Sequence, residues 1–257
     1  MKTIWIGTSG WSYKHWIGRF YPAHLKPSDF LAYYVQHFDC TELNASFYRL
    51  PKAAMVEGWR IRTPFHFRLC PKLSRLITHQ KKLVEVEDSL ARFFEVFAIL
   101  KEKLGPILIQ LPPSMQFDAS RVQPFFQLLK ERYGTYSFAL EARHDSWFNA
   151  DALHLLREYC IALVIAHSGG RFPYRETVTS HLVYLRFHGP GRLYASDYPD
   201  EMLDTYAQKM VNWTQQGLTV WAFFNNDVEG YAVKNAKTLQ SFVQHYLQSA
   251  KTRTEQE

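Results

Sequence analysis

The sequence contains little cysteine and no long apolar run. Only three of its 257 residues are cysteines, Cys40, Cys70 and Cys160, and they lie far apart in apolar, strand-like segments. This spacing matches neither a disulfide framework nor a zinc motif, so we expect three buried, reduced thiols that bind no metal. No window approaches the length of a membrane span, and the amino terminus lacks the apolar core of a signal peptide. We therefore expect a cytoplasmic protein without membrane contact.

Motifs that bind nucleotides, hold metals or activate a nucleophile are also missing. The segment GTSG after the first apolar run is too short for a dinucleotide-binding loop, and no P-loop occurs. There is no H-x-H or H-E-x-x-H pair, and no G-x-S-x-G turn that would activate Ser9 or Ser12. The formal net charge is +6, yet no basic run is longer than Lys81-Lys82. That excess is compatible with anionic ligands and equally with an ordinary surface.

The chain is rich in aromatic residues, at 16%, and in short apolar runs separated by segments of helical period. Eight runs have the length and composition of buried strands. They are Thr3–Gly7, Asp39–Asn44, His66–Cys70, Pro106–Leu111, Ser137–Ala142, Ala162–Ala166, Leu182–Phe187 and Thr219–Phe224. Helices are predicted over Leu90–Leu104, Gln123–Tyr133, Asp151–Tyr159 and Glu201–Gln215.

Near-continuous apolar strands that alternate with helices predict a parallel α/β sheet covered on both faces. About eight such strands in a chain of this length are typical of a TIM-type barrel, so we predict one barrel domain over residues 1–249. A doubly wound open sheet is the alternative. Residues 250–257 are polar and are expected to form a flexible tail.

Polar residues occur preferentially at one end of the predicted strands, the end that each strand reaches last. In the segment SFALEARHDSW, for example, an apolar strand runs directly into Glu141, Arg143 and His144. Active sites of parallel barrels form where the strands reach their carboxyl ends, so these residues predict a rim with a shared site. Residues two apart share one face of a strand, which places Glu141 beside Arg143 and Arg186 beside His188.

Histidines follow four different predicted strands, and we expect them to share one pocket. They are His79, His144, His167 and His188.

Two interpretations of the charged rim remain open. The Glu141–Arg143 pair can simply close the top of the barrel, because buried charges must be paired. Alternatively, Arg143 and Arg186, together with Lys72 and His188, hold an anion, since guanidinium groups match phosphate and carboxylate oxygens.

The second interpretation gives each candidate residue a chemical role. Glu42 or Glu141 would move a proton, with His144 or His79 as the partner acid. Polar, charged and aromatic side chains at neighbouring strand ends would bind the substrate. These candidate binding residues are Trp11, Tyr13, Asn44, Tyr48, Lys72, Gln110, Arg143, Trp147, Arg186, His188, Asn225 and Asn226.

Seven segments of the chain together resemble one family. They read GTSGWSYKHWIGRFYP, ELNASFYRLP, FHFRLCPKLSRLITH, LGPILIQLPPS, EARHDSW, YLRFHGP and FFNNDVEGYAVKNA. In this order they are similar to the signature segments of the YecE-like family, also called domain of unknown function seventy-two, from about Ile6 to Leu239. The resemblance implies a TIM-type barrel with site residues inside these motifs, and it implies no established reaction.

Three classes of function follow from these observations. The first is an enzyme, a hydrolase, lyase or isomerase, that acts on a small phosphorylated or carboxylated substrate. The second is a nucleic-acid-processing enzyme, by analogy with endonuclease-IV-like barrels. The third is a non-catalytic module that binds nucleic acid or protein. No cofactor and no metal is predicted, because arginines on the rim repel cations; a divalent metal held by its Glu and His side chains is the alternative. The oligomeric state is left open.

Overall fold

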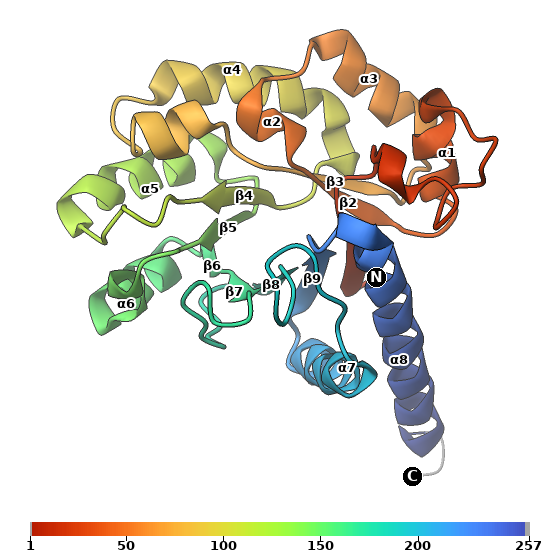
Figure 1. Cartoon of the computed structure of the whole chain (residues 1–257). Helices are drawn as coiled ribbons and strands as arrows, with labels where there is room; N and C mark the ends of the chain where they lie inside the picture. The colour runs from red at the N-terminus through yellow and green to blue at the C-terminus, as the bar shows by residue number, and fades with distance from the viewer. Residues whose placement is uncertain (1, 255–257) are drawn as a thin grey trace.

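The computed structural model describes residues 2–254 and contains parallel strands surrounded by helices (Figure 1). The strands are β1 (Ile4–Ser9), β2 (Cys40–Leu43), β3 (Arg68–Pro71), β4 (Ile107–Gln110), β5 (Phe138–Glu141), β6 (Ala162–Leu163), β7 (Ile165–His167), β8 (Leu182–Phe187) and β9 (Thr219–Phe224). Each of the eight predicted runs contains or overlaps an observed strand, and β6 and β7 divide one run between them. The predicted parallel α/β class is confirmed.

The strands form two parallel sheets rather than one continuous ladder. The six-stranded sheet has the order β3-β2-β1-β9-β8-β7, and the three-stranded sheet has the order β4-β5-β6. Isolated bridges pair Leu69 with Leu104 and Lys72 with Leu108 on one side. On the other side only Val164 separates β6 from β7. The described residues thus have the strand order of the predicted barrel, without a hydrogen-bonded ladder that closes it.

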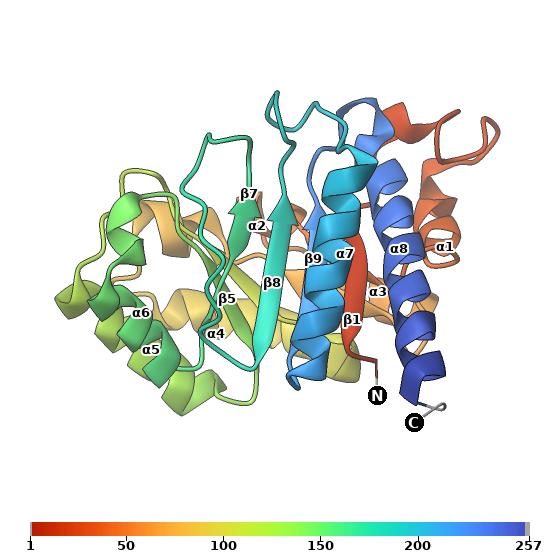
Figure 2. The same cartoon turned by 90° about the horizontal axis from the view of Figure 1, so that it is seen from below.

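The helices cover the outer faces of the sheets (Figures 1 and 2). They are α1 (Phe30–Tyr34), α2 (Ala45–Tyr48), α3 (Ala53–Arg62), α4 (Glu87–Phe97), α5 (Ala119–Tyr133), α6 (Ala150–Glu158), α7 (Asp200–Gln215) and α8 (Tyr231–Thr254). The four predicted helices correspond to α4–α7. The predicted helix to Leu104 ends earlier, at Phe97, and a 3-10 turn follows in which Lys101 has a φ of 53°. Helix α8 continues to Thr254, so it includes the first residues of the predicted tail; residues 255–257 lie outside the described residues.

Apolar spacing explains why these helices pack as they do. In α4, Leu90, Phe93, Phe94 and Phe97 are buried and recur at intervals of three or four residues, so they form one apolar face. In α5 the side chain of Asp118 accepts a hydrogen bond from the Ser120 backbone N–H, which fixes the start of the helix. No helix within residues 2–254 is both long and apolar enough to span a membrane.

The inner faces of the strands have a core of their own. Its members are Trp5, Cys40, Cys70, Leu108, Ala139, Ala162, Val164, Ala166, Leu182, Tyr184, Trp221 and Phe223. Because side chains on a strand alternate between faces, the next inward residue lies two positions further on. On most strands that residue, or the one two beyond it, is polar. Examples are Ser9, Glu42, Lys72, Gln110, Glu141, Arg186 and Asn225. The interior is therefore apolar at one end and charged at the carboxyl ends.

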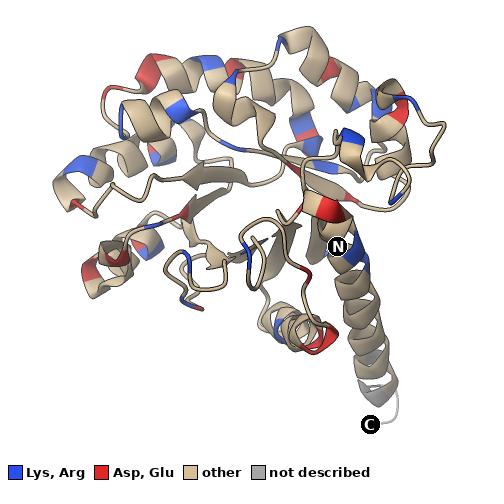
Figure 3. Ribbon diagram, in the orientation of Figure 1, with Lys and Arg blue, Asp and Glu red and all other residues tan. Residues whose placement is uncertain are grey.

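The carboxyl ends of the strands all lie at one end of the molecule. In Figure 2 the arrowheads of β7 and β8 point to the same end, and the loops that follow them project beyond the sheet. Both signs of charge are interspersed along the outer helices in Figure 3.

The three cysteines differ in exposure. Cys40 and Cys70 are buried and free, as predicted, but Cys160 is exposed. The prediction that Cys160 is buried is wrong because this residue lies in the turn after α6, with a φ of 53°, before the buried strand begins.

Candidate active site

Arg186 is the centre of a buried ion network at the carboxyl ends of the strands. Its side chain is 1% exposed. Nε donates a hydrogen bond to Oε2 of Glu42 over 2.9 Å, Nη2 donates to Oε1 of Glu42 over 2.6 Å, and Nη1 donates to Oε2 of Glu141. Burial alone would lower the pKa of Arg186, but the two carboxylates outweigh it and raise that pKa. All three guanidinium nitrogens are thus engaged with glutamates.

Glu42 has no free acceptor site. Besides the two bonds from Arg186, its carboxylate accepts a hydrogen bond from the Ser9 hydroxyl and another from the Tyr184 hydroxyl, each over 2.9 Å. A carboxylate has about four lone-pair sites, and four donors occupy them here. Glu42 therefore serves to hold Arg186, and the geometry does not favour the predicted role as a base.

Glu141 is held in a similar way. Its Oε1 accepts a hydrogen bond from Nε of Arg143 over 2.9 Å and lies 3.4 Å from Nε2 of His188. Burial alone would raise the pKa of this carboxyl, but Arg186 and Arg143 outweigh burial and hold the pKa well below its usual range. A carboxylate stabilised in this way is a weak base. The predicted contact between Glu141 and Arg143 is present.

A cavity of about 630 Å³ lies at the open side of this network. It is lined by Tyr13, Asn44, Phe47, Tyr48, Lys72, Arg75, His79, Gln110, Arg143, Arg186, Tyr194, Asn225, Asp227 and Val228. Twelve of the predicted catalytic and binding residues belong to this set or to the buried network beneath it: Tyr13, Glu42, Asn44, Tyr48, Lys72, His79, Gln110, Glu141, Arg143, Arg186, His188 and Asn225.

Lys72 is buried in the wall of the cavity without an acidic partner. Its Nζ donates a hydrogen bond to Oε1 of Gln110 over 2.6 Å and lies 3.9 Å from the centre of the Phe47 ring. Within residues 2–254, no carboxylate lies within ion-pair distance of this amine. Burial, with a further contribution from Arg186, lowers the pKa of Lys72 to about 7. The side chain can therefore gain or lose a proton at neutral pH.

His79 lies next to the side-chain amide of Gln110. Its Nδ1 is 2.9 Å from the Thr78 hydroxyl, and its Nε2 is 3.5 Å from Nε2 of Gln110. Burial, followed by the charge of Lys72, lowers the pKa of His79 to about 4. At neutral pH the imidazole is uncharged, so it is a poor proton donor and an available acceptor.

Arg143 directs part of its guanidinium at the cavity. Its Nε is bonded to Glu141, and its Cζ lies 4.1 Å from the centre of the Phe172 ring. No hydrogen bond to Nη1 or Nη2 is found among the described residues. These donors face the cavity together with the exposed side chain of Arg75, so the wall can accept an anion.

A second cavity of about 500 Å³ adjoins the first. The two share Tyr13, Asn44 and Tyr48. Trp11 lines the second cavity and packs edge-on against Trp59, with 5.6 Å between ring centres. Trp11 therefore lines a cavity with its aromatic ring, as predicted, but it is the second cavity and not the one above Arg186.

Three predicted site residues belong neither to the two cavities nor to the buried network. His144 caps the 3-10 turn Asp145–Phe148, where its Nδ1 accepts a hydrogen bond from the Ser146 backbone N–H. Trp147 is fully buried and donates from Nε1 to the carbonyl of Met115. Asn226 is also buried and donates to the side chain of Asn235. His144 and Trp147 follow β5 where the chain leaves the rim, and they support the loop there, whereas Asn226 follows β9 and holds the loop after β8 through the carbonyl of Ser196.

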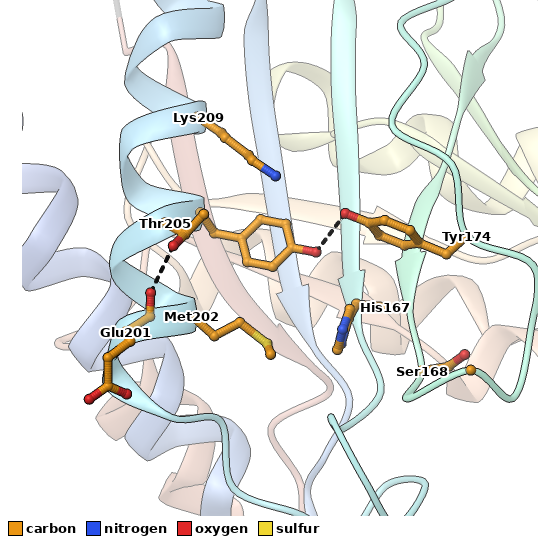
Figure 4. A pocket seen from close by; sticks show the side chains of 9 residues that line it. His167, Ser168, Tyr174, Glu201, Met202, Thr205 and Lys209 are labelled. Atoms are coloured by element: carbon orange, nitrogen blue, oxygen red, sulfur yellow. Dashed lines mark hydrogen bonds between the residues drawn. The ribbon is translucent and has the colours of Figure 1, made fainter.

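The predicted pocket of four histidines is wrong. His188 is fully buried beneath the cavity, with Nδ1 3.1 Å from Nδ2 of Asn225. Its pKa is lowered, because burial outweighs the attraction of Glu141. His167 lines a different cavity of about 530 Å³, between the loop after β7 and helix α7. Figure 4 shows His167 there near Tyr174, whose hydroxyl forms a hydrogen bond with that of Tyr206.

The buried network is a poor place for a metal ion. No group of three or more His, Cys, Asp or Glu side chains within residues 2–254 is arranged to hold one. The two glutamates that would be its oxygen ligands, Glu42 and Glu141, already surround the guanidinium of Arg186. That the protein uses no metal stays a prediction.

Sequence reasoning did not name Tyr184, Phe172 or Tyr194 as residues of this site. Tyr184 lies two positions before Arg186, so strand alternation was a signal that its hydroxyl faces inward. Phe172 and Tyr194 come from the loops after β7 and β8, and nothing in the sequence marks loop residues as neighbours of Arg143 or of the cavity.

Comparisons with known proteins agree with the fold. Residues 5–257 match the family model described as "Protein of unknown function DUF72". The chain is 27% identical to the UPF0759 protein YunF of Bacillus subtilis over 92% of this chain and 93% of that protein. It is 30% identical to the UPF0759 protein YecE of Escherichia coli over 145 residues, which are 56% of this chain but only half of YecE.

Solved structures are similar over most of the chain. The crystal structure of a DUF72 family protein from Thermotoga maritima matches with a TM-score of 0.85 and 30% identity, and it covers 94% of this chain and 99% of that one. A DUF72 family protein from Enterococcus faecalis, at 22% identity, matches with a TM-score of 0.80 over 94% of this chain and 95% of that one, and shows the fold alone.

Proposed function

The chain belongs to the family described as protein of unknown function DUF72, a name that specifies no reaction. From the geometry of the site we propose that the protein is an enzyme that acts by acid-base chemistry on a small anionic substrate. The substrate would carry a phosphate or carboxylate group and would bind in the cavity above Arg186.

The observation that carries this proposal is Lys72. A buried amine without an acidic partner destabilises the fold when it is charged, so a purely structural role gives no reason to keep it. Its pKa of about 7 matches what general acid-base catalysis requires at neutral pH. Lys72 replaces Glu42 and Glu141 as the proposed proton carrier, because both carboxylates are bound to arginines.

The second support is that the two arginines make different contacts. Arg186 is paired with both Glu42 and Glu141, and its charge together with that of Arg143 balances the two carboxylates. Arg143 retains free guanidinium donors at the cavity, and a guanidinium in this position would bind one face of a phosphate or carboxylate.

Thermal shift with small anions tests this function. Sulfate, phosphate or pyruvate should raise the melting temperature of the wild type, because a ligand that binds only the native state stabilises it. The rise should disappear in Arg143→Ala. It should persist in Arg175→Ala, a matched control, since Arg175 also lies over a phenylalanine, Phe148, but lines no part of this cavity. A wild type that no anion stabilises would refute the proposal.

A second candidate function is the binding or processing of single-stranded nucleic acid. It is favoured by Tyr48, which is 75% exposed at the cavity mouth close to the exposed Arg75, because such pairs stack on bases and contact phosphates. Retention on heparin distinguishes the candidates. A steep fall in retention with salt, lessened in Tyr48→Ala and Arg75→Ala, would favour nucleic acid, and weak, shallow retention would favour the small substrate.

A further inference from the structure

We propose that Lys72 is a nucleophile that forms an imine with the carbonyl carbon of an anionic aldehyde or ketone, such as an α-keto acid or a phosphorylated ketone. The inference rests on the proposed anion-binding function, gives Lys72 a covalent role in place of proton transfer, and adds a substrate class. It is argued from the position of the amine, the orientation of its neighbours and the charges around it.

The position of Lys72 suits a nucleophile. It follows directly after β3, at the carboxyl end of the strand, and its side chain belongs to both the buried interior and the wall of the 630 Å³ cavity. The residue is 7% exposed, so the aliphatic stem is fixed by packing while the amine reaches space that a substrate can fill. A buried lysine without a cavity would have no room for a carbonyl compound.

Its neighbours leave the nitrogen lone pair free. Nε2 of Gln110 donates to the carbonyl of Leu111 over 2.7 Å, which turns Oε1 of the same amide toward Lys72. An amide oxygen only accepts hydrogen bonds, so it takes one N–H of the amine. The Phe47 ring lies on another side and accepts no proton either. No carboxylate within residues 2–254 lies within ion-pair distance of the amine, so its lone pair is available to a substrate.

Burial, with a further contribution from Arg186, favours the uncharged amine and outweighs the opposite effect of Glu141 and Glu42. At pH 7 an amine with a pKa of about 7 is about half unprotonated, whereas a lysine of ordinary pKa is unprotonated in roughly one molecule in a few thousand. Only the unprotonated form attacks carbonyl carbon. The same surroundings, with Arg143 on the cavity wall, select a carbonyl compound that carries a negative charge.

The reaction is a condensation that needs no further reagent. The Nζ lone pair bonds to the carbonyl carbon, the C–O π electrons move to oxygen, and a proton moves from nitrogen to oxygen to give a carbinolamine. The hydroxyl then leaves with a proton as water, and a C=N double bond remains. Overall, an amine and a carbonyl give an imine and water, and hydrolysis reverses the step. The imine withdraws electrons from the adjacent carbon, so an acid-base enzyme can break a bond there.

Reductive trapping tests the proposal on the wild-type protein. The protein is incubated at pH 7 with pyruvate and sodium borohydride, which delivers hydride to the imine carbon and leaves a stable secondary amine. Peptide mass spectrometry then locates the modified lysines. We expect modification at Lys72 to exceed that at any other lysine by about tenfold or more, since its unprotonated fraction is about a thousandfold larger. Acetone, which is uncharged, should modify Lys72 less than pyruvate does.

Lys103 is an internal control in the same digest. It is also buried, but its Nζ donates to the backbone carbonyls of Arg60 and Thr63 and it lines no part of this cavity. Modification spread evenly over the lysines, or absent from Lys72, would overturn the imine. If pyruvate still raises the melting temperature through Arg143 in that case, the anion-binding function stands. Trapping at Lys72 without any such stabilisation would instead support the imine and overturn anion binding by Arg143.

Discussion

Replacing Arg186 with alanine should destabilise the protein severely. In the variant Glu42 keeps only the hydroxyls of Ser9 and Tyr184, with no cation beside it, and Glu141 keeps Arg143. Removing one member of a buried ion network typically costs about 3–5 kcal/mol, because the remaining charge is buried and unpaired. At about 2–4 °C per kcal/mol for a chain of this size, the melting temperature should fall by roughly 10 °C.

The pH dependence of this loss identifies its cause. In the wild type the pKa of Glu141 lies below its value in the unfolded chain. The resulting stabilisation is present above the unfolded pKa of about 4.3 and is lost as the pH falls toward the folded value. In Arg186→Ala the charge that lowers this pKa most is absent, so the variant should lose less unfolding free energy than the wild type when the pH falls. The difference in unfolding free energy between the two proteins should therefore narrow below about pH 4.

Urea or thermal unfolding at several pH values, followed by circular dichroism, measures both quantities. The matched control is Arg19→Ala, which breaks an exposed ion pair with Glu229 and should cost about 0–1 kcal/mol at every pH. An Arg186→Ala variant as stable as Arg19→Ala, with an unchanged pH profile, would refute the view that Arg186 neutralises a buried layer.

Four other changes have defined outcomes. At pH 6 the Lys72→Met variant should have a higher melting temperature than the wild type. This difference should shrink above about pH 7, because folded wild-type Lys72 then loses its proton while the unfolded lysine keeps it to about pH 10.4. Thermal unfolding at several pH values measures the difference. Exhaustive chelation should leave the melting temperature unchanged, and a large fall restored by one divalent ion would contradict a metal-free rim. A thiol reagent should label Cys160 in the native protein, but Cys40 and Cys70 only after denaturation, because burial raises the pKa of both thiols. Trp147→Ala should cost about 3–5 kcal/mol while the affinity for sulfate stays the same, as calorimetry can show.

The strands could be predicted because buried parallel strands are almost continuously apolar. The ranges of β8 and β9 agree with prediction to the residue, and the others differ by one to three residues at their ends. Helix α3 was missed because its apolar residues do not recur at helical intervals along one face. Helix α8 was missed although Ala236, Leu239 and Val243 are buried and recur at helical intervals, a signal that the sequence already carried.

At the site, strand alternation predicted local pairs but not distant ones. It gave the neighbourhood of Glu141 and Arg143, which are two residues apart on one face. It could not give the pair of Glu42 and Arg186, since that contact depends on how strands far apart in the sequence face each other across the interior. The low pKa of Lys72 was equally out of reach, because burial and the lack of a carboxylate are properties of the packed interior. His144 was misplaced because the rules for strands stop applying where the strand ends.

The neutralising contact between Glu42 and Arg186 joins residues 144 positions apart. A ribosome that adds about 5–20 residues per second makes Glu42 roughly 7–30 s before its counter-ion. During that interval an inward-facing β2 would carry an uncompensated carboxylate. Burying this unpaired carboxylate is unfavourable, so the amino-terminal part of the nascent chain should not pack its interior before Arg186 is made. Its final packing waits for β8, so chains that terminate before Arg186 should remain open to proteases and chaperones.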